Sequence, residues 1–215
     1  MDVNPAGYLA RRVSKALGWV NASVPVLGSA QIPGGTIAPL TTFGAEHDAL
    51  WARTREGIGV SIDRTADYMT WRLQKRPGSE AYRMAALHVN GTLAGEIAWC
   101  VENKHGGRIG YVMELLHDPA RSAHGTALMR HALRMMARDG VEVVLAWNDA
   151  SAFNARAHRA AGFLPLPARL QPIELHWGVV ALGSDAQSDT LANTLAARIY
   201  NRDAWYISYL DSDTV

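Results

Sequence analysis

The stretch from residue 108 to residue 147 constrains the fold more than any other part of the chain. It reads RIGYVMELL at 108–116, then a segment with one broad apolar stripe that ends at Gly140, then VEVVLAW at 141–147. The spacing in the middle segment predicts a helix over 118–140, and the flanking runs predict strands. Strand, helix and strand in this order predict a right-handed crossover that leaves the two strands parallel and adjacent. Because 141–147 is almost wholly apolar, we expect a central strand buried on both faces.

Antiparallel strands are predicted upstream of this unit. Two strand-like runs, 81–89 and 92–103, are joined by Asn90-Gly91, a strong hairpin signal, and a turn then leads into 108–116. Before them, one helix is expected over 45–57, and a second from Asp63 until Pro77 stops it. The sequence therefore predicts a mixed α/β domain, in which an antiparallel meander precedes a β-α-β crossover and helices cover both faces of the sheet.

The two ends of the chain predict further elements. An amphipathic helix is expected over 5–17, and the glycines and prolines of 28–40 are typical of a connector. We therefore predict an N-terminal helical extension and linker at 1–40 and a single domain at 41–215. Downstream, strands are expected at 172–182 and 203–210, with a helix at 189–201 between them.

Composition excludes several classes of function. The 21 Lys and Arg residues nearly balance the 20 Asp and Glu residues, so no nucleic-acid footprint is visible. The single cysteine, Cys100, excludes an internal disulfide and a CxxC site, and its place in a strand predicts a core thiol. We expect a cytoplasmic protein, because no run has the length of a membrane span and polar residues interrupt the signal-like start. Motifs of serine hydrolases, zincins and P-loop proteins are absent, and no metal site is expected.

The glycine-containing turn RSAHGTALM at 121–129 and the later Gly162-Phe163 pair carry a family resemblance. Together with the order of elements over 41–210, they resemble the Gcn5-related N-acetyltransferase (GNAT) superfamily. Ala123 stands where that family usually has its first glycine. Counted back from Gly162, the family's Asn, Ala and Tyr positions are filled by Ser151, Asn154 and His158.

The resemblance implies acetyl-CoA, or another acyl-CoA, as the donor. Unpaired N–H groups at a helix start suit a pyrophosphate, and small residues let its oxygens approach. A plain helix start capped by Asp118-Pro119 is the alternative. In the family, main-chain groups near the equivalent of residues 114–116 pair with the pantetheine arm, and a bulge there would free them. The residues expected to hold the cofactor are Leu115, Leu116, Arg121, Ser122, Ala123, His124, Gly125, Thr126, Ser151 and Asn154.

Two residues are candidates for the chemistry. His158 occupies the tyrosine position and would protonate the departing thiolate, whereas the alternative is a solvated helix histidine. Glu114 would act as the base, directly or through water, and the alternative is a carboxylate that faces solvent. For Ser151 and Asn154 the alternative is simple helix capping. Trp51, Tyr68 and Trp71 are expected in the core, with an aromatic platform for a sugar as the alternative, since the family's acceptor usually lies beside the first two helices.

The predicted function is acyl transfer from a CoA thioester to an amine, on a small molecule such as a sugar or a glycan precursor. One alternative is a non-catalytic GNAT-like lobe that binds a partner. Another is an aminoacyl-tRNA donor, against which the near-zero net charge argues. The segments RTADYMTWRL and WYISYLDSDTV look like the second half of two-lobed GNAT-like proteins of polysaccharide loci. A partner lobe or a second copy of the chain would then be the partner.

Overall fold

The computed structural model describes residues 30–104, 106–147, 153–164, 178 and 197–212. At its centre is one five-stranded sheet in the order β1-β2-β3-β4-β5. Its strands are β1 (Gly35–Pro39), β2 (Arg83–Val89), β3 (Thr92–Lys104), β4 (Gly107–His117) and β5 (Val143–Ala146). Strands β1 to β4 pair antiparallel to one another in chain order, and β5 is parallel to β4. This is the mixed sheet that the resemblance to the GNAT superfamily implied, so the predicted fold is confirmed.

The hairpin between β2 and β3 forms where the sequence predicted it. Asn90 and Gly91 both have positive φ, 51° and 79°, which a two-residue turn of the hairpin type requires. Val89 therefore pairs with Thr92. The segment expected to be a connector contains β1, which pairs with β2 from Gly35 to Pro39. A proline is tolerated there because β1 is an edge strand of the described sheet.

Strands β4 and β5 pair over a short distance only. Their register runs from Ile109 opposite Val143 to Val112 opposite Ala146. The next residue of β4, Met113, is a bulge, since Val112 pairs with Trp99 while Glu114 already pairs with Ala98. From there to His117, β3 is the strand that pairs with β4 within the described residues. The expectation of a buried central strand at 141–147 is wrong for the described part of the sheet, because β5 is its edge and most of its residues are half-buried.

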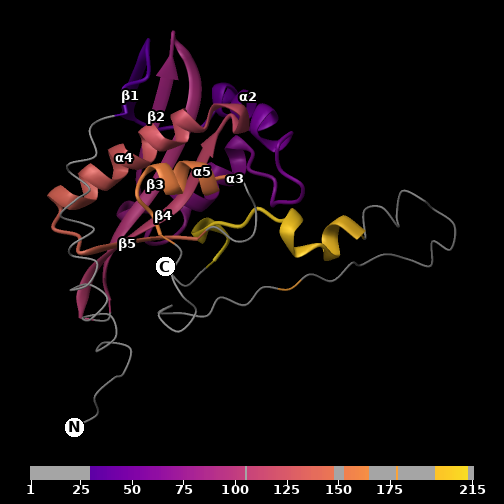
Figure 1. The fold of residues 1–215 in the computed structure, drawn as a ribbon. Helices are drawn as coiled ribbons and strands as arrows, with labels where there is room; N and C mark the ends of the chain where they lie inside the picture. The colour runs from indigo at the N-terminus through magenta and orange to yellow at the C-terminus, as the bar shows by residue number, and fades with distance from the viewer. Residues whose placement is uncertain (1–29, 105, 148–152, 165–177, 179–196, 213–215) are drawn as a thin grey trace, which may run out of the picture.

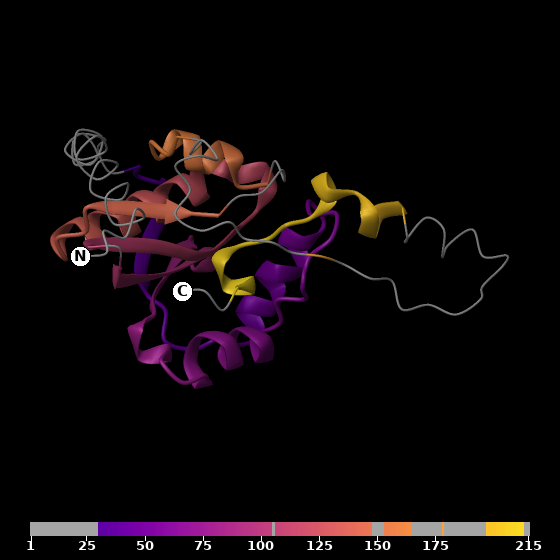
Figure 2. The same cartoon turned by 90° about the horizontal axis from the view of Figure 1, so that it is seen from below.

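Helices cover the two faces of the sheet (Figures 1 and 2). Helices α4 (Ser122–Arg138) and α5 (Ala155–Ala160) lie on one face, where the apolar stripe of α4 packs on β2, β3 and β4. The other face is covered by α2 (Ala45–Arg55), α3 (Ala66–Thr70) and the π-helical turn η2 (Trp71–Lys75). Short 3-10 turns occur at η3 (Ser79–Ala81) and at η4 (Pro119–Arg121), directly before α4. None of the helices in the described ranges combines the length and apolar character that crossing a membrane requires.

The C-terminal segment differs from its prediction. Residues 203–210 were expected to be a strand, yet they form the 3-10 turns η6 (Arg202–Ala204) and η7 (Tyr209–Asp211). One isolated bridge, between Trp205 and Val60, is the segment's β pairing within the described residues. The alternation fails because Tyr206, Ile207 and Ser208 are all buried, and because Ser208 and Asp211 form a capping box. The expected elements at 5–17 and 172–182 lie outside the described residues, apart from Gly178, as does most of 189–201, of which 197–200 is helical.

Replacing Leu128 by Ala tests how strongly α4 is anchored. The side chain of Leu128 is fully buried, and a Cβ at Gly95 of β3 would come within 2.8 Å of its Cδ1, so the two elements are closely packed. We expect the free energy of unfolding to fall by roughly 2–5 kcal/mol. Leu164→Ala is the matched control, because Leu164 is 70% exposed and should lose about 0.5 kcal/mol or less. Urea denaturation of both variants measures the difference, and equal losses would contradict this packing.

Candidate functional site

Glu114, the expected base, lies in a buried polar cluster on the face that α2 and α3 cover. Its side chain is 2% exposed, so the interpretation of a solvent-facing carboxylate is wrong. The Arg64 Nε donates to Glu114 Oε2 at 2.5 Å, and the Ser208 hydroxyl donates to the same oxygen at 3.0 Å. The Leu115 N–H donates to Glu114 Oε1 at 2.9 Å, and the Tyr206 hydroxyl donates to it as well. Both carboxylate oxygens are thus held by groups of the protein.

The main-chain carbonyl of Leu115, expected to pair with the donor's arm, also has partners within the chain. It accepts from Asn154 Nδ2 at 2.9 Å and from the Tyr206 hydroxyl at 3.2 Å. Asn154 Nδ2 lies 3.1 Å from the same hydroxyl, so the three groups form one buried network. Asn154 is the N-terminal boundary residue of α5, but its side chain makes no capping bond, and the capping interpretation is wrong for it. Burial and the neighbouring Glu114 charge raise the pKa of Tyr206 well above its ordinary value, so the phenol is neutral.

Two arginines contact the C-terminal segment: Arg64, which lies between α2 and α3, and Arg72, which lies in η2. Arg64 Nη2 lies 2.6 Å from Asp211 Oδ2, and Arg64 is fully buried beneath Tyr206. Arg72 donates to the carbonyl oxygens of Leu210 and Ser212, each at 2.7 Å. Both arginines belong to RTADYMTWRL and these partners to WYISYLDSDTV, the two segments that resemble two-lobed GNAT-like proteins. The sequence did not indicate that the two segments meet.

The start of α4 is accessible where a pyrophosphate was expected. Arg121 and Ala123 are exposed and Ser122 is half-exposed, and the first turn carries no acidic residue. The Asp118 side chain accepts from the Ala120 N–H at 2.9 Å and caps η4, as the alternative interpretation predicted. These two features are compatible, because the cap satisfies η4 while the first N–H groups of α4 come later in the chain.

Three other residues of this turn face inward. A Cβ at Gly125 would lie 2.4 Å from His117 Cδ2 and 3.0 Å from Ala157 Cβ, so this glycine permits close packing of α4 on β4 and α5. His124 is buried, and Thr126 uses its hydroxyl within the helix by donating to the Ser122 carbonyl at 3.0 Å. The expectation that phosphate oxygens approach at Gly125 therefore does not fit its surroundings.

His158, the expected acid, is also buried, with 8% of its surface exposed, so the interpretation of a solvated helix histidine is wrong. Its ring packs against Phe163, with centroids 5.5 Å apart. Burial, together with the smaller effect of nearby His117, lowers the pKa of His158 to about 4. The imidazole is thus neutral at pH 7 and holds no imidazolium proton to give away.

The structure brings only some of the predicted site residues together. Asn154, Leu115 and Glu114 belong to one network, but among the contacts of the described residues none joins His158 to Glu114. Leu116 is a core residue opposite Glu96 of β3. Ser151 lies outside the described residues.

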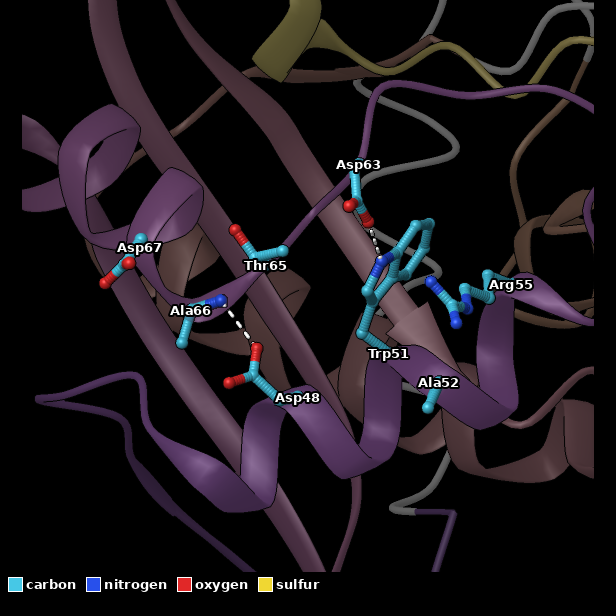
Figure 3. A pocket seen from close by; sticks show the side chains of 8 residues that line it. All are labelled: Asp48, Trp51, Ala52, Arg55, Asp63, Thr65, Ala66 and Asp67. Atoms are coloured by element: carbon cyan, nitrogen blue, oxygen red, sulfur yellow. Dashed lines mark hydrogen bonds between the residues drawn. The ribbon is translucent and has the colours of Figure 1, made fainter.

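A cleft of about 390 Å³ lies between α2 and α3 (Figure 3). Three carboxylates line it, those of Asp48, Asp63 and Asp67, together with Arg55 and the ring of Trp51. Asp63 accepts from Trp51 Nε1 at 2.5 Å, and Asp48 accepts from the Ala66 N–H at 2.8 Å. The cleft therefore combines a fixed aromatic wall with excess negative charge.

The aromatic residues near this cleft divide between core and surface. Trp51 is buried, as expected, and Tyr68 is half-buried. Trp71 is 54% exposed, so its assignment to the core is wrong. The π-helical turn η2 begins at this residue, and Leu73 and Arg72 take the buried positions of the turn instead. Cys100 is buried as predicted, and burial raises its thiol pKa to about 12.

A second buried pair fixes α2 to the sheet. His47 Nδ1 lies 2.7 Å from Glu96 Oε2, and His47 Nε2 lies 2.7 Å from the Arg64 carbonyl. Burial alone would lower the pKa of His47, but the hydrogen bond and charge of Glu96 outweigh it, so the pKa is raised. The pair holds the backbone of Arg64 in place, and no motif in the sequence indicated it. Among the described residues, no group of three or more His, Cys, Asp or Glu side chains could hold a metal ion.

Comparison with known proteins finds distant structural likenesses only. No family model matches the chain, and no curated protein does. An aminoglycoside acetyltransferase from an uncultured soil metagenomic sample, solved with trehalose, is similar at 16% identity and a TM-score of 0.46, over 68% of this chain and 97% of its own. Glucosamine-6-phosphate N-acetyltransferase from Arabidopsis thaliana is similar at 13% identity and a TM-score of 0.43, over 67% of this chain and 97% of its own. An aminoglycoside 6'-N-acetyltransferase from Acinetobacter haemolyticus is similar at 14% identity and a TM-score of 0.44, over 69% of this chain and 99% of its own. Likenesses at this distance carry no argument about this chain's substrate.

Arg64→Met should be among the most destabilising single changes in the protein. It would leave Glu114 and Asp211 buried without their cation, which commonly costs about 3–5 kcal/mol. Arg83→Met is the matched control, because the Arg83–Asp139 pair lies at the surface and such pairs contribute about 1 kcal/mol or less. The comparison is made by chemical denaturation at pH 7. A loss of about 1 kcal/mol or less for Arg64→Met would contradict the central role of this ion pair.

His158 and His47 should titrate on opposite sides of 6.5, the ordinary histidine pKa. NMR titration of the assigned ring protons should place His158 near pH 4 and His47 above 6.5.

Between pH 6.5 and 4 only the unfolded chain protonates residue 158, so this residue makes stability fall as the pH falls. His158→Gln should therefore flatten the acid side of the stability profile. His47→Gln provides the opposite case, because the contribution of His47 is present below pH 6.5 and is lost as the pH rises through its folded pKa. A His158 resonance titrating near 6.5 would contradict its burial.

Proposed function

We propose that the chain is an N-acyltransferase that moves an acyl group from a CoA thioester to an amine. The observation that carries the proposal is that β5 ends opposite Val112, while β4 runs on past the bulge at Met113 to His117. Past the bulge, the Leu115 carbonyl is free of β5 pairing, and its partners are side chains. An extended amide-containing arm can pair with a strand in this position as a further strand would.

The start of α4 fits the anionic end of such a donor. Its exposed first turn, with Ser122 and Ala123, offers N–H groups and a favourable dipole within a short distance of the end of β4. Arg121, whose Nε lies 3.7 Å from Asp118 Oδ2, adds a positive charge at the surface. Gly125 is excluded from this role because it packs inward.

The cleft between α2 and α3 supports an amine as the acceptor. Carboxylates of Asp48, Asp63 and Asp67 attract an ammonium group, and Trp51 provides an apolar wall. The cleft is connected to the candidate base through the backbone, since Asp63 and Thr65 of its lining flank Arg64, which holds Glu114. We propose a small cationic amine, such as an amino sugar, as the acceptor class.

The proposed reaction requires few groups of the protein. The thioester supplies an electrophilic carbonyl carbon, to which the amine nitrogen bonds as the C–S bond breaks and the amine proton is passed on toward the thiolate. Glu114 can accept that proton only after Tyr206 or Ser208 releases one of its oxygens. His158 forms part of the apolar wall of α5 in this proposal, because a neutral imidazole of such low pKa is not a proton donor of the imidazolium kind.

One observation favours a second candidate function, that of a non-catalytic lobe. The Leu115 carbonyl and both Glu114 oxygens are occupied by Asn154, Tyr206, Ser208 and Arg64. In a lobe that has lost its donor, such a network would be permanent, and the protein would bind a partner rather than an acyl-CoA. The two candidates differ in whether acetyl-CoA binds.

Ala123→Glu tests the proposed donor site without disturbing the core, because Ala123 is exposed. The added carboxylate would lie at the first turn of α4 and repel the phosphates, so we expect acetyl-CoA affinity to fall by about tenfold or more at low salt. Calorimetric titration measures it, with Ala123→Gln as the neutral control of the same shape. Ala137→Glu, at an exposed position near the other end of α4, should bind as the wild type does. Equal affinity for the Glu and Gln variants would overturn the donor site, and no binding by any of these proteins would favour the non-catalytic lobe.

A further inference from the structure

The C-terminal segment from Tyr206 to Asp211 lies against the part of β4 that the donor would need. Tyr206 is 2% exposed, and its hydroxyl contacts both Glu114 and the Leu115 carbonyl. Leu210 packs in the same core cluster, and η7 contacts β4. A donor arm that paired with the Leu115 carbonyl would have to take the place of the phenol.

The segment is held by the burial of Tyr206, Ile207 and Leu210 and by polar contacts at a few points. Arg64 binds Asp211, Ser208 binds Glu114, and Arg72 binds two backbone carbonyls near the end of the segment. Its β pairing consists of one bridge, in which the Tyr206 N–H donates to the Val60 carbonyl and the Val60 N–H to the Ala204 carbonyl. A segment that is joined to its neighbour by one bridge, and not by a full ladder, can leave as a local unit while the sheet stays folded.

Each buried group that the segment covers would keep at least one partner if the segment moved. Glu114 would keep Arg64 and the Leu115 N–H, and the Leu115 carbonyl would keep Asn154. Arg64 would lose Asp211 but would keep its ion pair with Glu114. The buried charges therefore remain paired in the open form, which makes opening affordable within the fold.

We propose that residues 206–211 are an internal gate, which competes with the acyl donor for the Leu115 carbonyl and leaves β4 before an acyl-CoA binds. This rests on the proposed function. The phenol of Tyr206 occupies the place of a donor amide, and Arg64 holds the gate closed through Asp211. Opening also exposes the Glu114 oxygen that the phenol had covered.

A reversible lock tests the gate. Val60 and Trp205 face each other across the bridge, and paired strands lie roughly 4.8 Å apart, within the range that a disulfide spans. Cysteines at these two positions, in a Cys100→Ser background, should close the gate covalently when oxidised. We expect acetyl-CoA to bind at least about tenfold more weakly to the oxidised protein than to the same protein after reduction, by calorimetric titration. The single variants Val60→Cys and Trp205→Cys, which cannot form the lock, are the controls and should not respond to oxidation.

A second variant opens the gate instead. Tyr206→Phe keeps the ring and removes the hydroxyl that contacts Leu115, so it should bind acetyl-CoA several-fold more tightly than the wild type. Hydrogen exchange provides a readout independent of the variants, since the Tyr206 amide should exchange faster when acetyl-CoA is added to the wild type.

The outcomes separate the two proposals. Equal affinity in the oxidised and reduced forms, or added protection of the Tyr206 amide by acetyl-CoA, would overturn the gate and leave the acyltransferase standing. Absence of acetyl-CoA binding by the wild type, the reduced protein and Tyr206→Phe alike would overturn both, because nothing would then compete with the phenol.

Discussion

The guanidinium of Arg64 is the interaction on which the arrangement of this protein depends. It is fully buried and contacts Glu114 on β4 and Asp211 in the C-terminal segment, while the backbone carbonyl of the same residue accepts from His47 on α2. Burial opposes its charge, but the two carboxylates outweigh that cost and raise the pKa of Arg64 above its ordinary value. Sheet, helix and C-terminal segment thus meet at one cation, which cannot be removed without leaving buried anions unpaired.

This cation also explains why two surfaces of different chemistry lie so close together. Asp63 and Thr65, on either side of Arg64 in the chain, face the acidic cleft, while the Arg64 side chain turns inward to Glu114. Arg64 therefore connects the residues that line the cleft to Glu114 on β4. A change of conformation at residues 63–65 would alter both the lining of the cleft and the contact with Glu114. The proposed acceptor and donor sites are therefore physically connected.

Local patterns predicted the sheet well because each one is decided by neighbouring residues. Asn90-Gly91 sets a turn, and the stripe of α4 needs only a sheet face to pack on. The candidate site could not be predicted to the same extent, because its contacts join residues far apart in the sequence. Glu114 was found by its place on β4, but its partners Arg64 and Ser208 lie 50 and 94 residues away. The strand expected at 203–210 failed for a similar reason, since the turn that replaces it is capped by Asp211, whose cationic partner Arg64 lies 147 residues earlier in the chain.

The distance in sequence between Arg64 and Asp211, 147 residues, has a consequence for synthesis of the chain. The helices and the strands up to β5 emerge from the ribosome while the carboxylate of residue 211 is still untranslated, so Glu114 must serve as the sole anionic partner of Arg64 in the meantime. Non-local contacts of this kind form late. The nascent domain therefore passes through a stage in which the end of β4 is uncovered, and its last step is the seating of Tyr206 over a strand that has already folded.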